Sequence, residues 1–155
     1  MIRHLRREQF IPAEPDRVWS FFATPLNLNE LTPPDVRFEI LDEVPARMYA
    51  GQIIRYRISP LPGVWLKWVT EITVVEAGFR FIDEQRAGPY KFWRHEHRFV
   101  PEDGGVRMFD HVAYTVGWGP LGWIAERLWV NRQLRKIFDY RQRRVSEIFR
   151  APRAE

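Results

Sequence analysis

The fold of this chain is decided by a strictly alternating stretch, Trp93-Arg94-His95-Glu96-His97-Arg98-Phe99. Successive side chains of a β-strand point to opposite faces, so the first, third, fifth and seventh residues of the stretch share one face. Asp103-Gly104 follows and is a strong signal for a two-residue hairpin turn. A second alternating run then extends from Val106 to Val116. The stretch therefore predicts a β-hairpin with one aromatic face that carries two histidines.

The turn also sets which residues face each other across the hairpin. A turn centred on Asp103-Gly104 places His97 opposite Asp110 on the apolar face. An imidazole held by a carboxylate is the arrangement that acid–base catalysis uses, which makes His97 and Asp110 the candidate catalytic residues. Two alternatives stay open: the pair could orient a ligand, or it could be a polar pair in a cavity wall in which each group satisfies the other. The other pairs on this face are Phe99 with Met108, His95 with Val112, and Trp93 with Tyr114.

The same face carries residue types that bind metals. His95, His97 and Asp110 are ligands of the kinds that zinc and iron accept. Side chains two apart on a strand are, however, roughly 7 Å apart at their bases, and no clear fourth ligand joins them on this face. We therefore expect no metal. The chain also has no cysteine and no glycine-rich phosphate loop, so we expect no cofactor, no disulfide and no thiol nucleophile.

Large aromatic side chains are unusually frequent. The 155 residues include seven Trp and eleven Phe, and 45% of the residues are hydrophobic, which suggests a bulky core or a ring-lined cavity. The length fits one domain, which we place at residues 1–150, with 151–155 as a tail. No apolar run approaches the roughly 18 residues of a membrane span. No signal peptide opens the chain, and the absence of cysteine fits a cytoplasmic protein.

The hydrophobic period changes twice along the chain. A strand-like segment at 2–11 precedes two short helices, one from Pro15 and one at 26–31. The period then becomes two, which predicts six consecutive antiparallel strands before residue 117, with a loop at 59–63. A turn at Ala77-Gly78 would pair Val74 with Phe81 and Ile72 with Asp83.

The last segment has the period of a long amphipathic helix. Its apolar residues recur at helical spacing from Leu121 to Phe149. An antiparallel sheet needs cover on one face, and this is the only predicted element large enough to supply it. A curved sheet around such a helix encloses a cavity. Entry would lie near 26–34 and 60–63.

The predicted helix is rich in basic residues. This pattern is typical of the solvated face of a helix, and the alternative is a docking surface for nucleic acid or anionic lipid. No recognised nucleic-acid-binding module accompanies it, so nucleic acid is not an expected partner. The basic residues are Arg132, Arg135, Lys136, Arg141, Arg143, Arg144 and Arg150, against Asp139 and Glu147.

Several stretches carry a resemblance to a known superfamily. They are residues 12–19 (Pro-Ala-Glu-Pro-Asp-Arg-Val-Trp), 27–34 (Asn-Leu-Asn-Glu-Leu-Thr-Pro-Pro), 83–90, 93–99, 119–122 and 137–141. Together they resemble the START-like, or SRPBCC, superfamily, in a bacterial ligand-binding branch related to polyketide cyclase/dehydrase and coenzyme-Q-binding proteins. The resemblance implies an α+β helix-grip fold, in which a curved seven-stranded antiparallel sheet wraps around a long C-terminal helix, with two short helices after the first strand. It also implies a pocket for a hydrophobic small molecule.

These observations predict the binding, and with it the transport, of a hydrophobic small molecule between sheet and helix. One alternative is a cyclase- or dehydratase-like enzyme that uses His97 and Asp110, and a second is docking to a partner or membrane through the basic helix. The oligomeric state stays open, because one fold hosts many functions and assemblies. The candidate ligand-binding residues are Tyr56, Trp68, Phe81, Gln85, Trp93, His95, His97, Asp110 and Tyr114.

Overall fold

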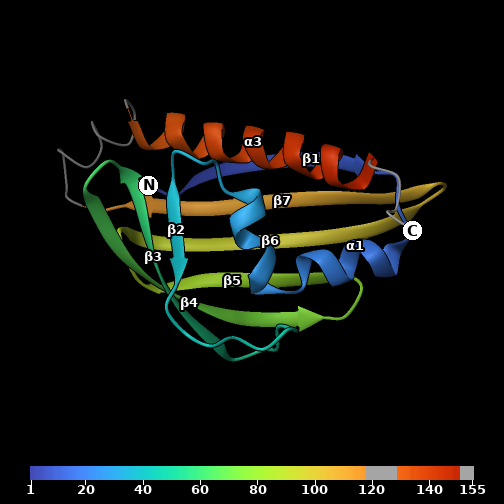
Figure 1. Ribbon diagram of the computed structural model, residues 1–155, viewed down its shortest axis with the longest axis horizontal. Coiled ribbons are helices and arrows are strands. Elements are labelled where there is room, and N and C mark those ends of the chain that lie inside the picture. Colours follow the sequence, from blue (N-terminus) through green and yellow to red (C-terminus); the bar gives the residue numbers. More distant parts are fainter. Residues whose placement is uncertain (118–128, 151–155) are drawn as a thin grey trace.

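A seven-stranded antiparallel sheet forms most of the protein (Figure 1). The structure, a computed structural model, describes residues 1–117 and 129–150. The sheet is curved and has the strand order β1-β7-β6-β5-β4-β3-β2. Strands β2 to β7 therefore lie side by side in the order of the chain, and β1 pairs with β7. The strands are β1 (Arg3–Ile11), β2 (Arg37–Ile40), β3 (Gln52–Leu61), β4 (Val64–Glu76), β5 (Arg80–Ala87), β6 (Tyr90–Glu102) and β7 (Gly105–Val116).

Two short helices and one long helix lie on one side of this sheet (Figure 1). They are α1 (Pro15–Phe22), the 3₁₀ helix η1 (Pro25–Leu31) and α3 (Asn131–Arg150). The first two begin at a proline, which suits the first helical position because it lacks an N–H. The predicted helix from 121 to 149 is confirmed from Asn131 onward, and its first eight residues lie outside the described residues. The predicted helix-grip architecture is therefore the observed one.

The predicted register of the central hairpin is confirmed. β6 and β7 pair His97 with Asp110 and Phe99 with Met108, with Glu102 and Gly105 closing the turn. Gly104 has a φ of 75°, a left-handed conformation that two-residue hairpin turns require and that glycine adopts without strain.

The register between β4 and β5 was predicted only in part. Ile72 faces Asp83 as expected, but Val74 faces Ile82 rather than Phe81. The turn spans three residues, because Glu76 pairs with Arg80, and Gly78 takes the left-handed position at a φ of 76°. An irregularity between Ile72 and Val74 then adds a residue to β4 and restores the expected pairing beyond it.

A second correction concerns the loop expected at 59–63. β3 continues to Leu61 and pairs with Val64, so the chain turns at Pro62 and Gly63. The register shifts between Ile58 and Leu61, at the end of the strand that contains Pro60. Such irregularities are where a sheet accommodates proline.

The core has two parts that meet at the middle of α3. One contains Val18 and Phe22 of α1 with Val145 and Phe149 of α3. The other lies toward the N-terminal half of α3 and contains Trp68, Trp93, Tyr114, Leu134 and Phe138 among others. Within the described ranges, no helix combines the length and apolar character needed to cross a membrane.

Candidate functional site

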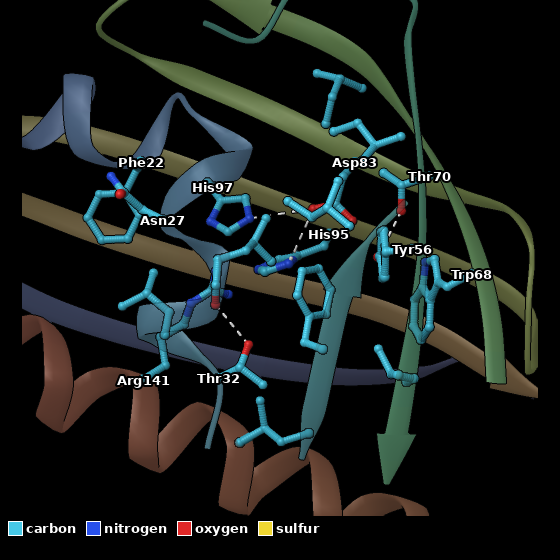
Figure 2. A pocket seen from close by; sticks show the side chains of 18 of the residues that line it. Phe22, Asn27, Thr32, Tyr56, Trp68, Thr70, Asp83, His95, His97 and Arg141 are labelled. Carbon is cyan, nitrogen blue, oxygen red and sulfur yellow. Dashed lines mark hydrogen bonds and ion pairs between the residues drawn. The ribbon is translucent and has the colours of Figure 1, made fainter. Parts of the chain in front are cut away.

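A cavity of about 190 Å³ lies between the sheet and α3, where the two parts of the core meet (Figure 2). One water needs roughly 10–15 Å³ by the same kind of measure, so the space can hold an organic molecule. Rings form much of its wall: Phe21, Phe22, Phe38, Tyr56, Trp68, Phe81, Tyr90, Trp93 and Phe138. Its polar lining is Thr24, Asn27, Thr32, Thr70, Asp83, His95, His97 and Arg141.

Six of the nine predicted ligand-binding residues line this cavity. The strands bring them together because inward-facing residues of neighbouring strands lie side by side. These six are Tyr56, Trp68, Phe81, Trp93, His95 and His97. The other three, Gln85, Asp110 and Tyr114, are not part of the wall. Tyr114 is 3% exposed and packs in the core, at a ring-centroid distance of 5.8 Å from Tyr90.

Asp110 contacts both histidines rather than only one of them. Its Oδ1 atom is 3.0 Å from Nε2 of His95, within hydrogen-bond distance. The same oxygen is 2.9 Å from Nδ1 of His97. The carboxylate is thereby enclosed, with 11% of its side chain exposed. The expected pairing of His97 with Asp110 is thus part of a larger group.

Asp83 completes this group from the next strand. β5 places it across from His95, and Oδ2 of Asp83 lies 3.4 Å from Nδ1 of His95 and 3.5 Å from Nε2 of His97. The indole N–H of Trp93 donates a hydrogen bond of 3.2 Å to Oδ1 of Asp83. Each imidazole therefore has one carboxylate on either side. We call Asp83, His95, His97 and Asp110 the His–Asp cluster.

Burial and charge shift the pKa values of the two imidazoles in opposite directions. Burial, together with the charge of His97, lowers the pKa of His95 to about 4. Burial opposes the charged form of His97 as well, but the carboxylates of Asp110 and Asp83 outweigh it and raise the pKa of His97 above its usual 6.5. A proton taken up by the two imidazoles therefore goes to His97 before His95.

The carboxylates of the cluster respond to the same forces. Burial alone would raise the pKa of Asp83 and of Asp110. The hydrogen bonds and charges of His95 and His97 outweigh this effect and lower both pKa values. The cluster thus combines two imidazoles with pKa values shifted in opposite directions and two carboxylates, which can accept or donate a proton within reach of a cavity.

The tyrosines of the wall stay protonated. Burial raises the pKa of Tyr56 and of Tyr90 far above the usual 10. The hydroxyl groups of Tyr56 and Thr70 are 3.0 Å apart and hydrogen-bond to each other. These side chains offer neutral polar contacts near the rings of Trp68 and Trp93.

Gln85 is engaged elsewhere in the fold. Its Nε2 atom donates a 2.6 Å hydrogen bond to the carbonyl of Tyr90, and its Oε1 atom accepts from the backbone N–H of Tyr90 at 3.2 Å. A Cβ atom on Gly88 would lie 2.5 Å from that Oε1, so glycine leaves the room for this clamp. Gln85 holds the β5–β6 turn and positions Tyr90, which does line the cavity.

Arg141 is the residue that the sequence interpretation misplaced. We predicted it on the solvated basic face of the last helix, whereas its side chain is half-buried and lines the cavity. Figure 2 shows it extending from α3 toward the histidines. The signal was its spacing, three residues after Phe138 and four before Val145, which places it in the apolar stripe of the helix.

Three residues of the cluster have the chemistry of a metal site. Ligand atoms of Asp83, His95 and His97 lie within 4.8 Å of one another, and the sequence had suggested Asp110 in place of Asp83. Neutral imidazoles and carboxylates suit zinc or iron. The same atoms, however, already satisfy one another through hydrogen bonds and ion pairs. The absence of a metal therefore stays a prediction.

The sequence model of one protein family matches residues 11–146. The family is described as polyketide cyclase / dehydrase and lipid transport. The chain belongs to this family, and with it to the START-like, or SRPBCC, superfamily. No curated protein is significantly similar to the chain.

Solved structures share the fold over nearly the whole chain. The Zhui aromatase/cyclase from Streptomyces sp. R1128 is 17% identical, with a TM-score of 0.75 over 97% of this chain and 94% of its own. TTHA0849 from Thermus thermophilus is 21% identical, with a TM-score of 0.67 over 94% and 95%. A nucleoside-diphosphate sugar epimerase from Corynebacterium glutamicum is 30% identical, with a TM-score of 0.66; the match covers 92% of this chain and 28% of the epimerase.

Proposed function

We propose that this protein binds a hydrophobic small molecule in the cavity between the sheet and α3, and that it can carry the molecule in this enclosed form. The observation that carries the proposal is the cavity itself, about 190 Å³ with a wall made mostly of rings and aliphatic side chains. Ligand pockets of proteins are typically preformed, concave and apolar, with a few polar groups that fix orientation. The family description, which includes lipid transport, is consistent with this function.

Apolar burial is the expected source of affinity. Each square ångström of apolar surface removed from water contributes roughly 25 cal/mol. Because the wall is already formed by packed rings, such as Trp68 and Trp93 at 5.2 Å, little ordering opposes binding. The polar groups of the wall would then select the orientation of the ligand.

A matched pair of variants on one strand tests this proposal. Ile54 and Ile53 are neighbours in β3, but Ile54 is 3% exposed and lines the cavity, whereas Ile53 is 49% exposed on the outer face. We expect the neutral dye 1-aminoanthracene to gain fluorescence with the wild-type protein. Ile54→Trp fills the cavity and should abolish the gain, while Ile53→Trp should preserve it.

Circular dichroism and thermal unfolding of both variants show whether they are folded. A folded Ile54→Trp protein that binds the dye as well as wild type would place the dye outside the cavity. Absence of dye binding to the wild-type protein would reject the proposed function.

A second candidate function is acid–base catalysis of the cyclase or dehydratase type. It is favoured by the His–Asp cluster, whose imidazoles have pKa values shifted in opposite directions beside an apolar space. Separated pKa values of neighbouring groups mark candidate acids and bases. In this hypothesis His97 and a carboxylate partner move a proton on a bound carbonyl compound.

Proton exchange tests this second candidate without knowledge of the substrate. Exchange at the carbon next to the carbonyl of 2-tetralone in D₂O, followed by NMR, should be faster with wild-type protein than with His97→Gln. Arg132→Gln, on the exposed face of α3, is the control and should behave as wild type. Equal exchange rates in all three proteins would reject catalysis by the cluster.

The docking function of the basic helix rests on charge alone. Arg132, Arg135 and Arg143 are exposed on α3, as the sequence suggested. No further feature of the described residues points to a docking partner.

A further inference from the structure

We propose that Arg141 anchors a carboxylate group of the ligand, so that the molecule bound in the cavity is an apolar carboxylic acid. This inference rests on the proposed function and names the class of ligand. Arg141 comes from the middle of α3, is half-buried and lines the cavity that also contains His95 and His97 (Figure 2).

The guanidinium of Arg141 has a buried donor without an acceptor. Its Nε atom is buried and has no hydrogen-bond partner in the described part of the chain. The guanidinium carbon lies 5.7 Å from the centroid of the Phe138 ring, which cannot neutralise the charge. Guanidinium groups carry five N–H donors and stay charged, so this position leaves charge and donors facing the cavity.

Other arginines of the fold are paired in a different way. Arg7 contacts Asp139 at 2.8 Å, and Arg144 of the same helix contacts Glu147 at 2.8 Å. Among residues 1–117 and 129–150, no carboxylate lies within 4.0 Å of the nitrogens of Arg141. The acids nearest the cavity, Asp83 and Asp110, are held by the two histidines instead.

An unpaired charge in an enclosed site is costly, and a suitable partner removes that cost. A carboxylate matches the planar guanidinium with two parallel hydrogen bonds, which makes it the partner of choice. The charge of Arg141 also acts on the rest of the cavity, because it contributes a lowering effect to the pKa of His97 and of Tyr56, although both pKa values are raised overall. An anionic group at this position would therefore change the electrostatic environment of His97 and Tyr56.

The remainder of the wall describes the rest of the ligand. Tyr56 stacks on Trp68 at 5.8 Å, and Trp93 meets Trp68 edge to face, which forms a continuous aromatic surface. Figure 2 places Trp68 and Arg141 on opposite sides of the view. The indole N–H of Trp68 is buried and, within the described residues, lacks an acceptor. A ring or alkyl body with an acidic end fits this division.

Two compounds of nearly equal shape separate charge from apolar fit. 2-Naphthoic acid carries a carboxylate at neutral pH, and 2-naphthamide carries a neutral amide in its place. By calorimetry we expect the acid to bind wild-type protein about tenfold or more tightly than the amide, as for hydrogen bonds between charged groups. Arg141→Gln should abolish this preference by weakening the binding of the acid. Arg141→Lys, which keeps the charge, should retain part of it.

The control is Arg143→Gln, which removes an exposed arginine two residues away on the same helix. It should bind both compounds as wild type does. Circular dichroism and thermal unfolding verify that Arg141→Gln is folded. Equal binding of acid and amide to wild-type protein would overturn the carboxylate proposal and leave the proposed function intact. Failure of both compounds and of the neutral dye to bind would reject both.

Discussion

His97 and Asp110 face each other across the β6–β7 hairpin, with Nδ1 of the histidine 2.9 Å from Oδ1 of the aspartate. The contact lies between the sheet and α3, where His97 is 3% and Asp110 11% exposed. Charges at such depth persist only when they are paired. The relationship therefore ties the protonation of His97 to the stability of the fold and to the chemistry of the cavity.

The first prediction concerns the proton on His97. Replacement of Asp110 by Asn removes one of the two carboxylates that raise the pKa of His97, so this pKa should fall. NMR titration of the imidazole protons measures it, with His97→Gln to assign the signal. Asp139→Asn removes an exposed carboxylate of α3 and should leave the pKa as in wild type. An unchanged pKa in Asp110→Asn would contradict the assigned contact.

The second prediction is a loss of stability in mild acid caused by His95. Its pKa is about 4 in the folded protein and 6.5 ordinarily. Between pH 6.5 and pH 4 the unfolded chain therefore binds a proton at His95 that the folded protein does not bind. The free energy of unfolding should fall as the pH drops through this window, by roughly 3 kcal/mol from this group. His97 acts in the opposite sense: its raised pKa stabilises the fold below pH 6.5, and that contribution is lost as the pH rises through the raised value.

Urea unfolding at a series of pH values measures both effects. His95→Gln can keep a hydrogen bond to Asp110 but does not titrate, so it should show a shallower loss between pH 6.5 and 4 than wild type. Identical pH profiles for wild type and His95→Gln would show that His95 does not carry the effect.

The third prediction separates the structural role of Gln85 from ligand binding. Gln85→Ala removes two hydrogen bonds to the backbone of Tyr90, and we expect the free energy of unfolding to fall by about 1–3 kcal/mol. Dye affinity of the folded variant should stay close to that of wild type, because Gln85 is not in the cavity wall. A large loss of affinity at unchanged stability would instead support the contact with ligand that the sequence suggested.

The fourth prediction concerns metal. If the His–Asp cluster is satisfied by its own ion pairs, addition of Zn²⁺ should raise the unfolding temperature of wild-type protein no more than it raises that of Asp83→Asn. A stoichiometric rise that Asp83→Asn abolishes would indicate a metal site formed by Asp83, His95 and His97.

Sequence reasoning succeeded where local rules are strict. The turn at Asp103-Gly104 and the alternation around it fix the register of β6 and β7, and so the pairing of His97 with Asp110. It failed at Val74, because the turn after β4 has three residues instead of the expected two. The extra residue between Ile72 and Val74, which restores the expected pairing at Ile72, carries no sequence signal of its own. One alternating pattern can accommodate either a two- or a three-residue turn.

The site was harder to predict than the fold. Asp83 joins the histidines through the pairing of β5 with β6, a relation between strands that the turn at 103–104 does not set. Arg141 has helical spacing from Phe138 and Val145, but a charged residue in an apolar stripe is readily assigned to the solvent side. Its inward position follows from the cavity, which only the packed structure reveals.

A crystal structure of the protein with 2-naphthoic acid tests the central claim most directly. The account predicts the naphthalene rings inside the cavity, against Trp68, Trp93 and Phe138, with the carboxylate within hydrogen-bond distance of Arg141. A structure in which the compound lies on the outer surface while the space between the sheet and α3 contains only water would contradict it.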